Sequence, residues 1–142
     1  MNESNHIDKW SPWAQRMQSI LRIVASAMYI LAGTMKIFAF PEGMPPDGST
    51  AEVMSQIWIG GVLEIVCGGL LLPGLFTRPA AFLMAGQMAV AYFQFHAPQG
   101  FFPTMNGGVS AVLYCFIWLY FWAAGAGPWS VDALRKKGSG VE

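Results

Sequence analysis

Charged side chains are scarce in this 142-residue chain. Asp, Glu, Lys and Arg together make up 11 % of the residues, whereas 54 % are hydrophobic. Soluble domains usually contain roughly 25 % charged residues. Residues 79–131 contain no charged side chain at all. A helix on the surface of a soluble domain needs a polar face, so these segments are excluded as surface helices, and their composition predicts membrane spans.

The residues that several classes of site require are also missing. The formal net charge is zero, and no basic patch predicts a nucleic-acid partner. Cys67 and Cys115 form no CxxC motif, and their spacing gives no support for a disulfide. Only His96 lies near the predicted membrane, which excludes a haem held by two histidines. No zinc signature, phosphate loop or nucleophile elbow is present. We expect no metal site, no intrinsic cofactor and no self-sufficient catalytic motif, which leaves enzymatic activity open.

Four apolar segments approach the ~20 residues needed to cross a ~30 Å hydrocarbon core; they are residues 17–40, 56–76, 79–95 and 108–127. Proline, glycine and short polar residues separate them at 41–49, 77–79 and 97–100, where a helix is not expected to continue. The predicted fold is therefore an all-α integral membrane protein with a four-transmembrane-helix bundle. The predicted parts are a polar N-terminal tail (1–16), the transmembrane domain (17–128), and a C-terminal tail (129–142) with a short amphipathic helix.

The distribution of Lys and Arg predicts how the spans are oriented. One side of the predicted membrane carries most of the basic residues, namely Lys9, Arg16, Arg22, Arg78, Arg135, Lys136 and Lys137. The other side has Lys36 beside three acidic residues, Glu42, Asp47 and Glu52. Cytoplasmic segments are enriched in Lys and Arg, so both termini are expected in the cytoplasm. The first span has no small-residue cleavage site and is expected to be retained. We therefore expect a multi-pass membrane protein.

Glu64 is the one charged residue of the apolar stretch 57–76. A carboxylate at that depth must be paired, protonated or placed against a water-filled cavity, because bare exposure to lipid costs several kcal/mol. Helical side chains lean toward the helix N-terminus, so Lys36 and Glu64, on oppositely running spans, point at each other. Arg22 is the alternative partner, although its long stem can instead extend its charge to the cytoplasmic surface. A purely structural ion pair remains the alternative to a functional one.

Further polar residues gather near the outer end of the predicted bundle. Tyr92, His96 and Asn106, together with Glu64 and Lys36, are candidates for lining a small polar pocket. Such a pocket suits an amphipathic molecule such as a quinone. The alternative is an ordinary interfacial belt, because aromatic and polar residues collect at membrane surfaces in any case.

The chain resembles the DoxX family of small four-span bacterial membrane proteins. The resemblance covers about residues 19–134 and includes Leu-Arg at 21–22, Leu-Ala-Gly-Thr-Met-Lys at 31–36, Gly-Val-Leu-Glu at 61–64, Gly-Leu-Phe-Thr-Arg at 74–78 and Asn-Gly-Gly at 106–108. It continues in Gly-Ala-Gly-Pro-Trp-Ser-Val-Asp at 125–132. By position, Arg22, Ser130 and Asp132 join Lys36, Glu64 and Asn106 as family-like residues.

The resemblance implies an accessory or quinone-interacting subunit of a membrane redox system, with quinone as the possible cofactor and redox-complex subunits as partners. Two alternatives stay open. One is a small-solute transporter or channel acting as a homo-oligomer, because four short spans enclose little volume. The other is a non-enzymatic membrane scaffold or assembly factor. The lipid bilayer is the expected surrounding in all three cases, and the resemblance implies that it is the bacterial cytoplasmic (inner) membrane, which the chain crosses several times.

Overall fold

A computed structural model describes residues 4–139, and the side chains of residues 12–139. The described part is all-helical apart from turns and one isolated bridge between Met44 and Ser49. The elements in chain order are α1 (Ser4–Phe38), α2 (Gln56–Leu71), α3 (Thr77–Ala91), the π-helical turn η1 (Tyr92–His96), the 3-10 turn η2 (Ala97–Gln99), α4 (Pro103–Asn106), α5 (Val109–Ala124) and α6 (Val131–Gly138).

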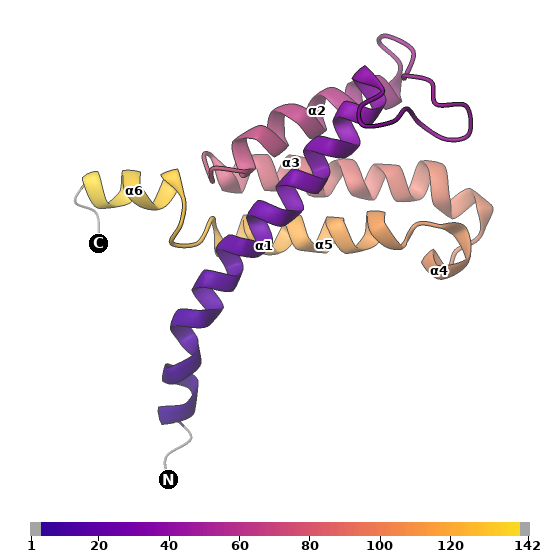
Figure 1. Ribbon diagram of the computed structural model, residues 1–142. Coiled ribbons are helices and arrows are strands. Elements are labelled where there is room, and N and C mark those ends of the chain that lie inside the picture. The colour runs from indigo at the N-terminus through magenta and orange to yellow at the C-terminus, as the bar shows by residue number, and fades with distance from the viewer. Residues whose placement is uncertain (1–3, 140–142) are drawn as a thin grey trace.

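The four longest helices pack together. Helix α1 crosses the others obliquely, and its N-terminal part projects beyond them (Figure 1). It packs mainly on α2, while α3 packs on α5 and also contacts α2. The connections between α1 and α2 and between η2 and α5 lie at one end of the bundle. The short α2–α3 turn and α6 lie at the other end.

Helix α1 begins earlier than the sequence indicated. Residues 4–16, predicted as a polar tail, are helical and continuous with the apolar part of α1. Among the residues described, α1 is the one helix long and apolar enough to cross a membrane, over Pro12–Phe38. Helices α2 and α5 are apolar but only 16 residues long, which corresponds to ~24 Å each.

The third helical segment also extends past its predicted end. The sequence predicted a break at 97–100, but α3 continues through η1 and η2 and stops at Gly100. Pro98 lies in the first turn of η2, where the π-helical turn passes into a 3-10 turn. Gly100 ends the run with φ of 141°, a conformation that favours glycine.

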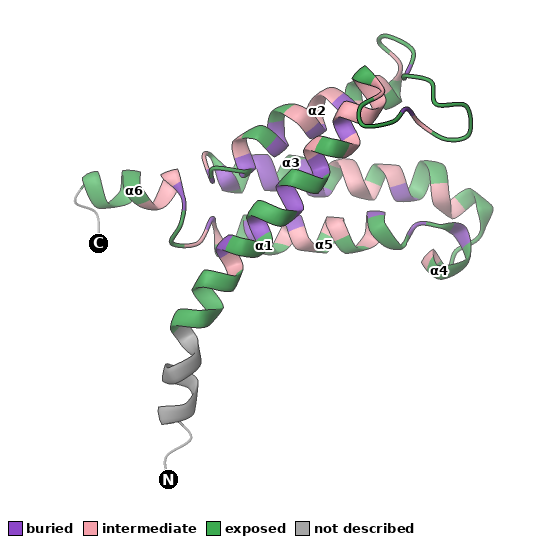
Figure 2. Cartoon of the chain, viewed as in Figure 1, coloured by how far each residue is buried: buried purple, intermediate pink, exposed green. Residues whose placement is uncertain are grey.

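The core lies where α1 crosses the other helices (Figure 2). Its largest buried side chains are Leu71, Met84, Trp118 and Phe121. From α1, Tyr29 packs edge-on against Trp118, with ring centroids 5.1 Å apart. The buried face of α1 carries Arg22, Ala25, Tyr29 and Gly33 at steps of three or four, as helical geometry predicts for residues on one face.

Glycines allow α1 and α2 to approach closely. A Cβ on Gly33 would lie 2.7 Å from the carbonyl oxygen of Gly61 and 2.7 Å from the side chain of Ile65. A Cβ on Gly68 would lie 2.8 Å from Ile30. Small residues are the usual means of close helix contact in membranes. Gly33 and Gly68 therefore allow the close approach from the two facing helices.

Replacing Gly33 with alanine is expected to destabilise the fold, because the new methyl group meets backbone that cannot rotate away. The expected loss is about 1–3 kcal/mol, as for overpacked cores, seen as a lower midpoint of thermal unfolding in detergent. Gly69→Ala is the control: nothing lies within 4 Å of its Cβ position, so helix propensity alone predicts no loss. Equal midpoints for the two variants would contradict the close approach.

Candidate functional site

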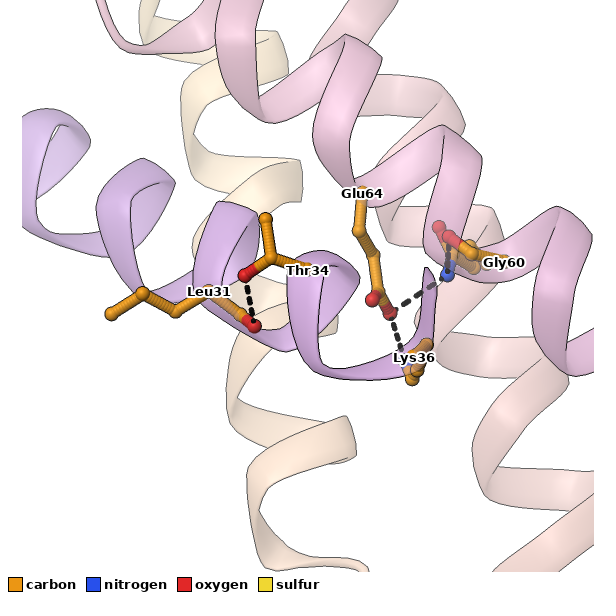
Figure 3. A network of polar contacts seen from close by, with 6 residues as sticks. Leu31, Thr34, Lys36, Gly60 and Glu64 are labelled. Atoms are coloured by element: carbon orange, nitrogen blue, oxygen red, sulfur yellow. Dashed lines mark hydrogen bonds and ion pairs between the residues drawn. The ribbon is translucent and has the colours of Figure 1, made fainter. Parts of the chain in front are cut away.

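Glu64 and Lys36 form an ion pair between α2 and the last turn of α1. Lys36 Nζ lies 2.5 Å from Glu64 Oε1. Figure 3 shows the Glu64 side chain pointing from α2 toward the end of α1 where Lys36 lies. Gln87 of α3 donates from Nε2 to the same carboxylate oxygen at 3.0 Å and to the carbonyl of Gly60 at 3.1 Å. Three helices therefore meet at one carboxylate.

The two partners of this ion pair differ in their access to solvent. The Glu64 side chain is 2 % exposed, whereas that of Lys36 is 27 % exposed. A buried charge is costly unless it is paired and hydrogen-bonded. The charge of Glu64 therefore depends on Lys36 for its stabilisation, whereas the amine of Lys36 can also be hydrated by water.

A cavity of about 380 Å³ opens beside the ion pair. All four long helices contribute to its walls, together with His96 and Phe95 of η1. The polar lining residues are Tyr29, Lys36, Gln56, Glu64, Gln87, His96, Ser110 and Tyr114. The rest of the lining is mostly apolar and consists of Met28, Ala32, Ile57, Gly60, Met88, Val90, Ala91, Phe95 and Ala111. A largely apolar pocket with a few polar groups is typical of small-molecule sites.

Several buried polar atoms in the cavity wall have no hydrogen-bond partner in the part of the chain described. They are Glu64 Oε2, Gln87 Oε1 and the Tyr29 hydroxyl. Buried polar groups are nearly always hydrogen-bonded. These three therefore mark positions where a bound molecule or water would be stabilised: two are acceptors, and the hydroxyl can donate or accept.

The five predicted pocket residues fall into two groups. Lys36, Glu64 and His96 line the cavity, whereas Tyr92 and Asn106 are not among its described lining residues. Asn106 instead braces the connection before α5: its side chain donates to Gly100 O at 2.6 Å and accepts from Gly108 N at 2.8 Å. The Tyr92 hydroxyl donates to the carbonyl of Phe101. His96 Nδ1 lies 3.1 Å from Asn106 O and links the two groups.

Arg22 lies far from Glu64, at the opposite end of the bundle. Its guanidinium donates to the carbonyls of Ala126, Trp129 (2.7 Å) and Leu72 (3.4 Å). The residue is 1 % exposed, so the expectation that Arg22 extends to the cytoplasmic surface is wrong, as is the alternative pairing with Glu64. The five N–H groups of a guanidinium suit it to hold several carbonyls at once.

Asp132 and Ser130 attach α6 to this end. Ser130 accepts from Ala133 N at 3.2 Å and caps α6. Asp132 accepts from the backbone N–H groups of Phe76 and Thr77 at 3.0 and 2.9 Å. Its backbone N–H also bonds to the carbonyl of Gly74. Asp132 therefore caps the start of α3, a contact between distant segments, in addition to lying in the first turn of α6.

Sequence reasoning missed Gln87 and the full role of Tyr29. Gln87 is a lone amide in the apolar run of α3, the same signal that singled out Glu64. Tyr29 is buried against Tyr114 and Trp118, which follows from the packing of α1 against α5. Cys67 and Cys115 are free thiols.

Comparisons with known proteins identify relatives over most of the chain. The sequence profile of the DoxX family matches residues 17–97. An uncharacterized protein of Haemophilus influenzae is 44 % identical over 131 residues, which cover 90 % of this chain and 95 % of that protein. A second uncharacterized protein of that organism is 30 % identical over 100 residues, covering 70 % of this chain and 62 % of the relative. No solved structure matches.

The two halves of the ion pair are expected to respond unequally to mutation. Lys36→Met leaves the buried Glu64 without its cation, and breaking a buried pair costs up to about 3–5 kcal/mol, less here because Lys36 is partly exposed. Glu64→Gln leaves a lysine that reaches water and should cost less. Thermal unfolding in detergent measures both variants.

The double variant Lys36→Met/Glu64→Gln is the control for this comparison. It removes both charges and is expected to recover much of the stability lost in Lys36→Met. If Glu64→Gln destabilised the fold more than Lys36→Met, the asymmetry inferred from the burial of the two side chains would be wrong.

Proposed function

Because this chain belongs to the DoxX family, we propose that it is a multi-pass protein of the bacterial cytoplasmic membrane that binds a quinone beside Glu64. In this proposal it serves as an accessory subunit of a membrane redox system. The observation that carries the proposal is a mainly apolar cavity lined by Tyr29, Glu64 and Gln87, each of which has a buried polar atom without a hydrogen-bond partner among the described residues.

The distribution of side chains supports several spans. Arg22 and Glu64 are buried inside the bundle, while large apolar side chains cover its outside. Among those exposed on α2, α3 and α5 are Ile57, Ile59, Val66, Phe82, Leu83, Val90, Leu113, Phe116 and Trp122. Exposed apolar patches of this extent mark contact with lipid or with partners. Short helices such as α2 are accommodated by local thinning of the bilayer.

The positions of the charges support the proposed orientation. Arg78, Arg135 and Lys136 line one cavity at the α6 end of the bundle, and the positive-inside rule favours a cytoplasmic position for an end rich in basic residues. The end with the two longer connections, and the cavity beside Glu64, then faces the outer half of the membrane.

The residues present fit a quinone head group. An oxidised quinone has only acceptors, and Lys36 Nζ and the Tyr29 hydroxyl are donors beside the cavity. The reduced form has hydroxyl groups, which can donate to Glu64 Oε2 and Gln87 Oε1. Apolar residues such as Met28, Val90 and Phe95 provide surface for the ring and the start of its tail. When bound, the quinone would supply the electron-accepting chemistry that no motif of this chain provides, which is why we assign the chain an accessory role.

A continuous transport route has less support. The cavity beside Glu64 involves residues 87–96 of the third segment and 110–114 of α5. Between it and the α6 end lie fully buried core residues, namely Met84, Trp118 and Phe121. A closed core of this kind favours a binding site entered from one side, and it leaves transport dependent on a larger rearrangement.

The topology is testable by cysteine labelling in intact cells. With Cys67 and Cys115 replaced by alanine, a cysteine introduced at Thr50 is expected to react with a membrane-impermeant maleimide from outside. A cysteine introduced at Ser139 is expected to react only after the cells are broken. Labelling of both positions from the same side would contradict the orientation, because they lie at opposite ends of the bundle.

Quinone binding is testable with purified protein by native mass spectrometry, using the reduced form of a short-chain ubiquinone or menaquinone as the probe, because its hydroxyl groups can donate to Glu64 Oε2. Glu64→Gln is expected to weaken binding about tenfold, because a hydrogen bond to a charged group contributes about 1.5–3 kcal/mol. Glu52→Gln is the matched control, since Glu52 is exposed and is not among the described residues that line the cavity. Equal affinity of wild type and Glu64→Gln would refute this site.

A further inference from the structure

A second cavity, of about 430 Å³, lies at the end of the bundle opposite Glu64. It is formed by the start of α3, the segment just after α5, and α6. Its lining includes the cationic residues Arg78, Arg135 and Lys136, and apolar surface from Phe76, Pro79 and Ala126. Three cations from two separate helices therefore converge on one hollow.

The arginines of this cavity are positioned by packing. The guanidinium of Arg135 lies over the ring of Phe76, 5.1 Å from its centroid, in the geometry of a cation–π contact. Arg78 lies beside Gly125, where an added Cβ would be 3.9 Å from its Nε. Each guanidinium has a planar set of N–H donors that suits the oxygens of a phosphate.

The carboxylate that lines this cavity offsets only part of its positive charge, because three cations line it with one carboxylate. Asp132 also lines it, but its two oxygens accept from the backbone N–H groups of Phe76 and Thr77. Within residues 12–139, the ion pair recorded is that of Lys36 with Glu64, at the other end. The described part of the cavity therefore keeps a net positive charge.

Thr77 adds a polar group without a partner. The residue is 1 % exposed and lines the cavity, and its hydroxyl has no hydrogen-bond partner among the described residues. Buried hydroxyls usually have a partner, so this one indicates a position where a ligand oxygen would be stabilised. It is a second sign of a ligand, independent of the cations.

We propose that this cavity binds a phosphate group, and that its source is the headgroup of an anionic phospholipid. The phosphate lies between Arg78, Arg135 and Lys136, with the Thr77 hydroxyl as a further donor. The apolar side of the cavity argues for a lipid, because Phe76 is 52 % exposed beside the cations. Trp129 and Leu134, on either side of the start of α6, are also exposed, as expected for residues at a membrane interface.

The test uses the full-length protein in detergent and counts bound lipids by native mass spectrometry. Phosphatidylglycerol and phosphatidylcholine are titrated in parallel, and inorganic phosphate is added as a competitor. We expect wild type to prefer phosphatidylglycerol. Arg78→Gln and Arg135→Gln should each weaken its binding about fivefold, the contribution of one basic residue near an anionic surface. Thr77→Val should weaken it without changing the charge.

Lys137→Gln is the matched control, because Lys137 is exposed on the same helix as Arg135 but does not appear among the described lining residues. It is expected to change binding much less than either arginine variant. Equal losses for Lys137→Gln and Arg78→Gln would overturn the site in favour of general surface charge, as would equal binding of the two lipids by wild type. Displacement of the lipid by millimolar phosphate, with no preference for the lipid, would make a free anion the ligand and overturn its lipid source. If Arg78→Gln fails to fold, the loss of phosphatidylglycerol binding in Arg135→Gln is compared with that in Lys137→Gln instead.

Discussion

The buried carboxylate of Glu64 constrains the end of the bundle at which the two long connections lie (Figure 1). It requires the amine of Lys36 and the amide of Gln87, so α1, α2 and α3 must approach one another at a single point. Glycines make this approach possible. A Cβ at Gly33 would lie 3.1 Å from the Glu64 Cβ, one at Gly60 would lie 3.1 Å from the Gln87 amide, and one at Gly61 would lie 3.0 Å from the Lys36 Cβ. The close helix packing and the ion pair therefore depend on the same positions.

A second polar centre organises the opposite end by different means. There the charged side chains of Arg22 and Asp132 form hydrogen bonds with backbone groups. Arg22 donates to three carbonyls, and Asp132 accepts from the N–H groups at the start of α3. These bonds attach α6 and the segment after α5 to the α2–α3 turn. Three basic residues line the cavity at this end beside the single described carboxylate of Asp132, so a net positive charge is left to interact with other anions. One end thus has a cavity beside the paired carboxylate of Glu64, and the other end has a cavity lined by cations. The apolar core separates them.

Much of this arrangement could be predicted from local signals. The absence of charge from 79–131 predicted helices with apolar surfaces, and the lean of side chains on antiparallel helices predicted the meeting of Lys36 with Glu64. Asn106 and Tyr92 were correctly placed near the same end, but their hydrogen bonds serve the connection before α5. They are not among the described residues that line the cavity, because the path of a connection sets which groups a residue can reach, whereas its distance from a helix end sets only its depth in the bundle.

The sequence by itself determined the helical class, the family, and the depth of each polar residue, because these depend on composition and on spacing along one helix. Only the tertiary structure decided what those residues contact. Arg22 has a long, charged side chain of the kind that extends to a membrane surface. It is nevertheless buried, because the carbonyls of two distant segments converge on it. Asp132 caps a helix that begins 55 residues before it. Such contacts follow from how helices cross, which no local pattern of residues specifies.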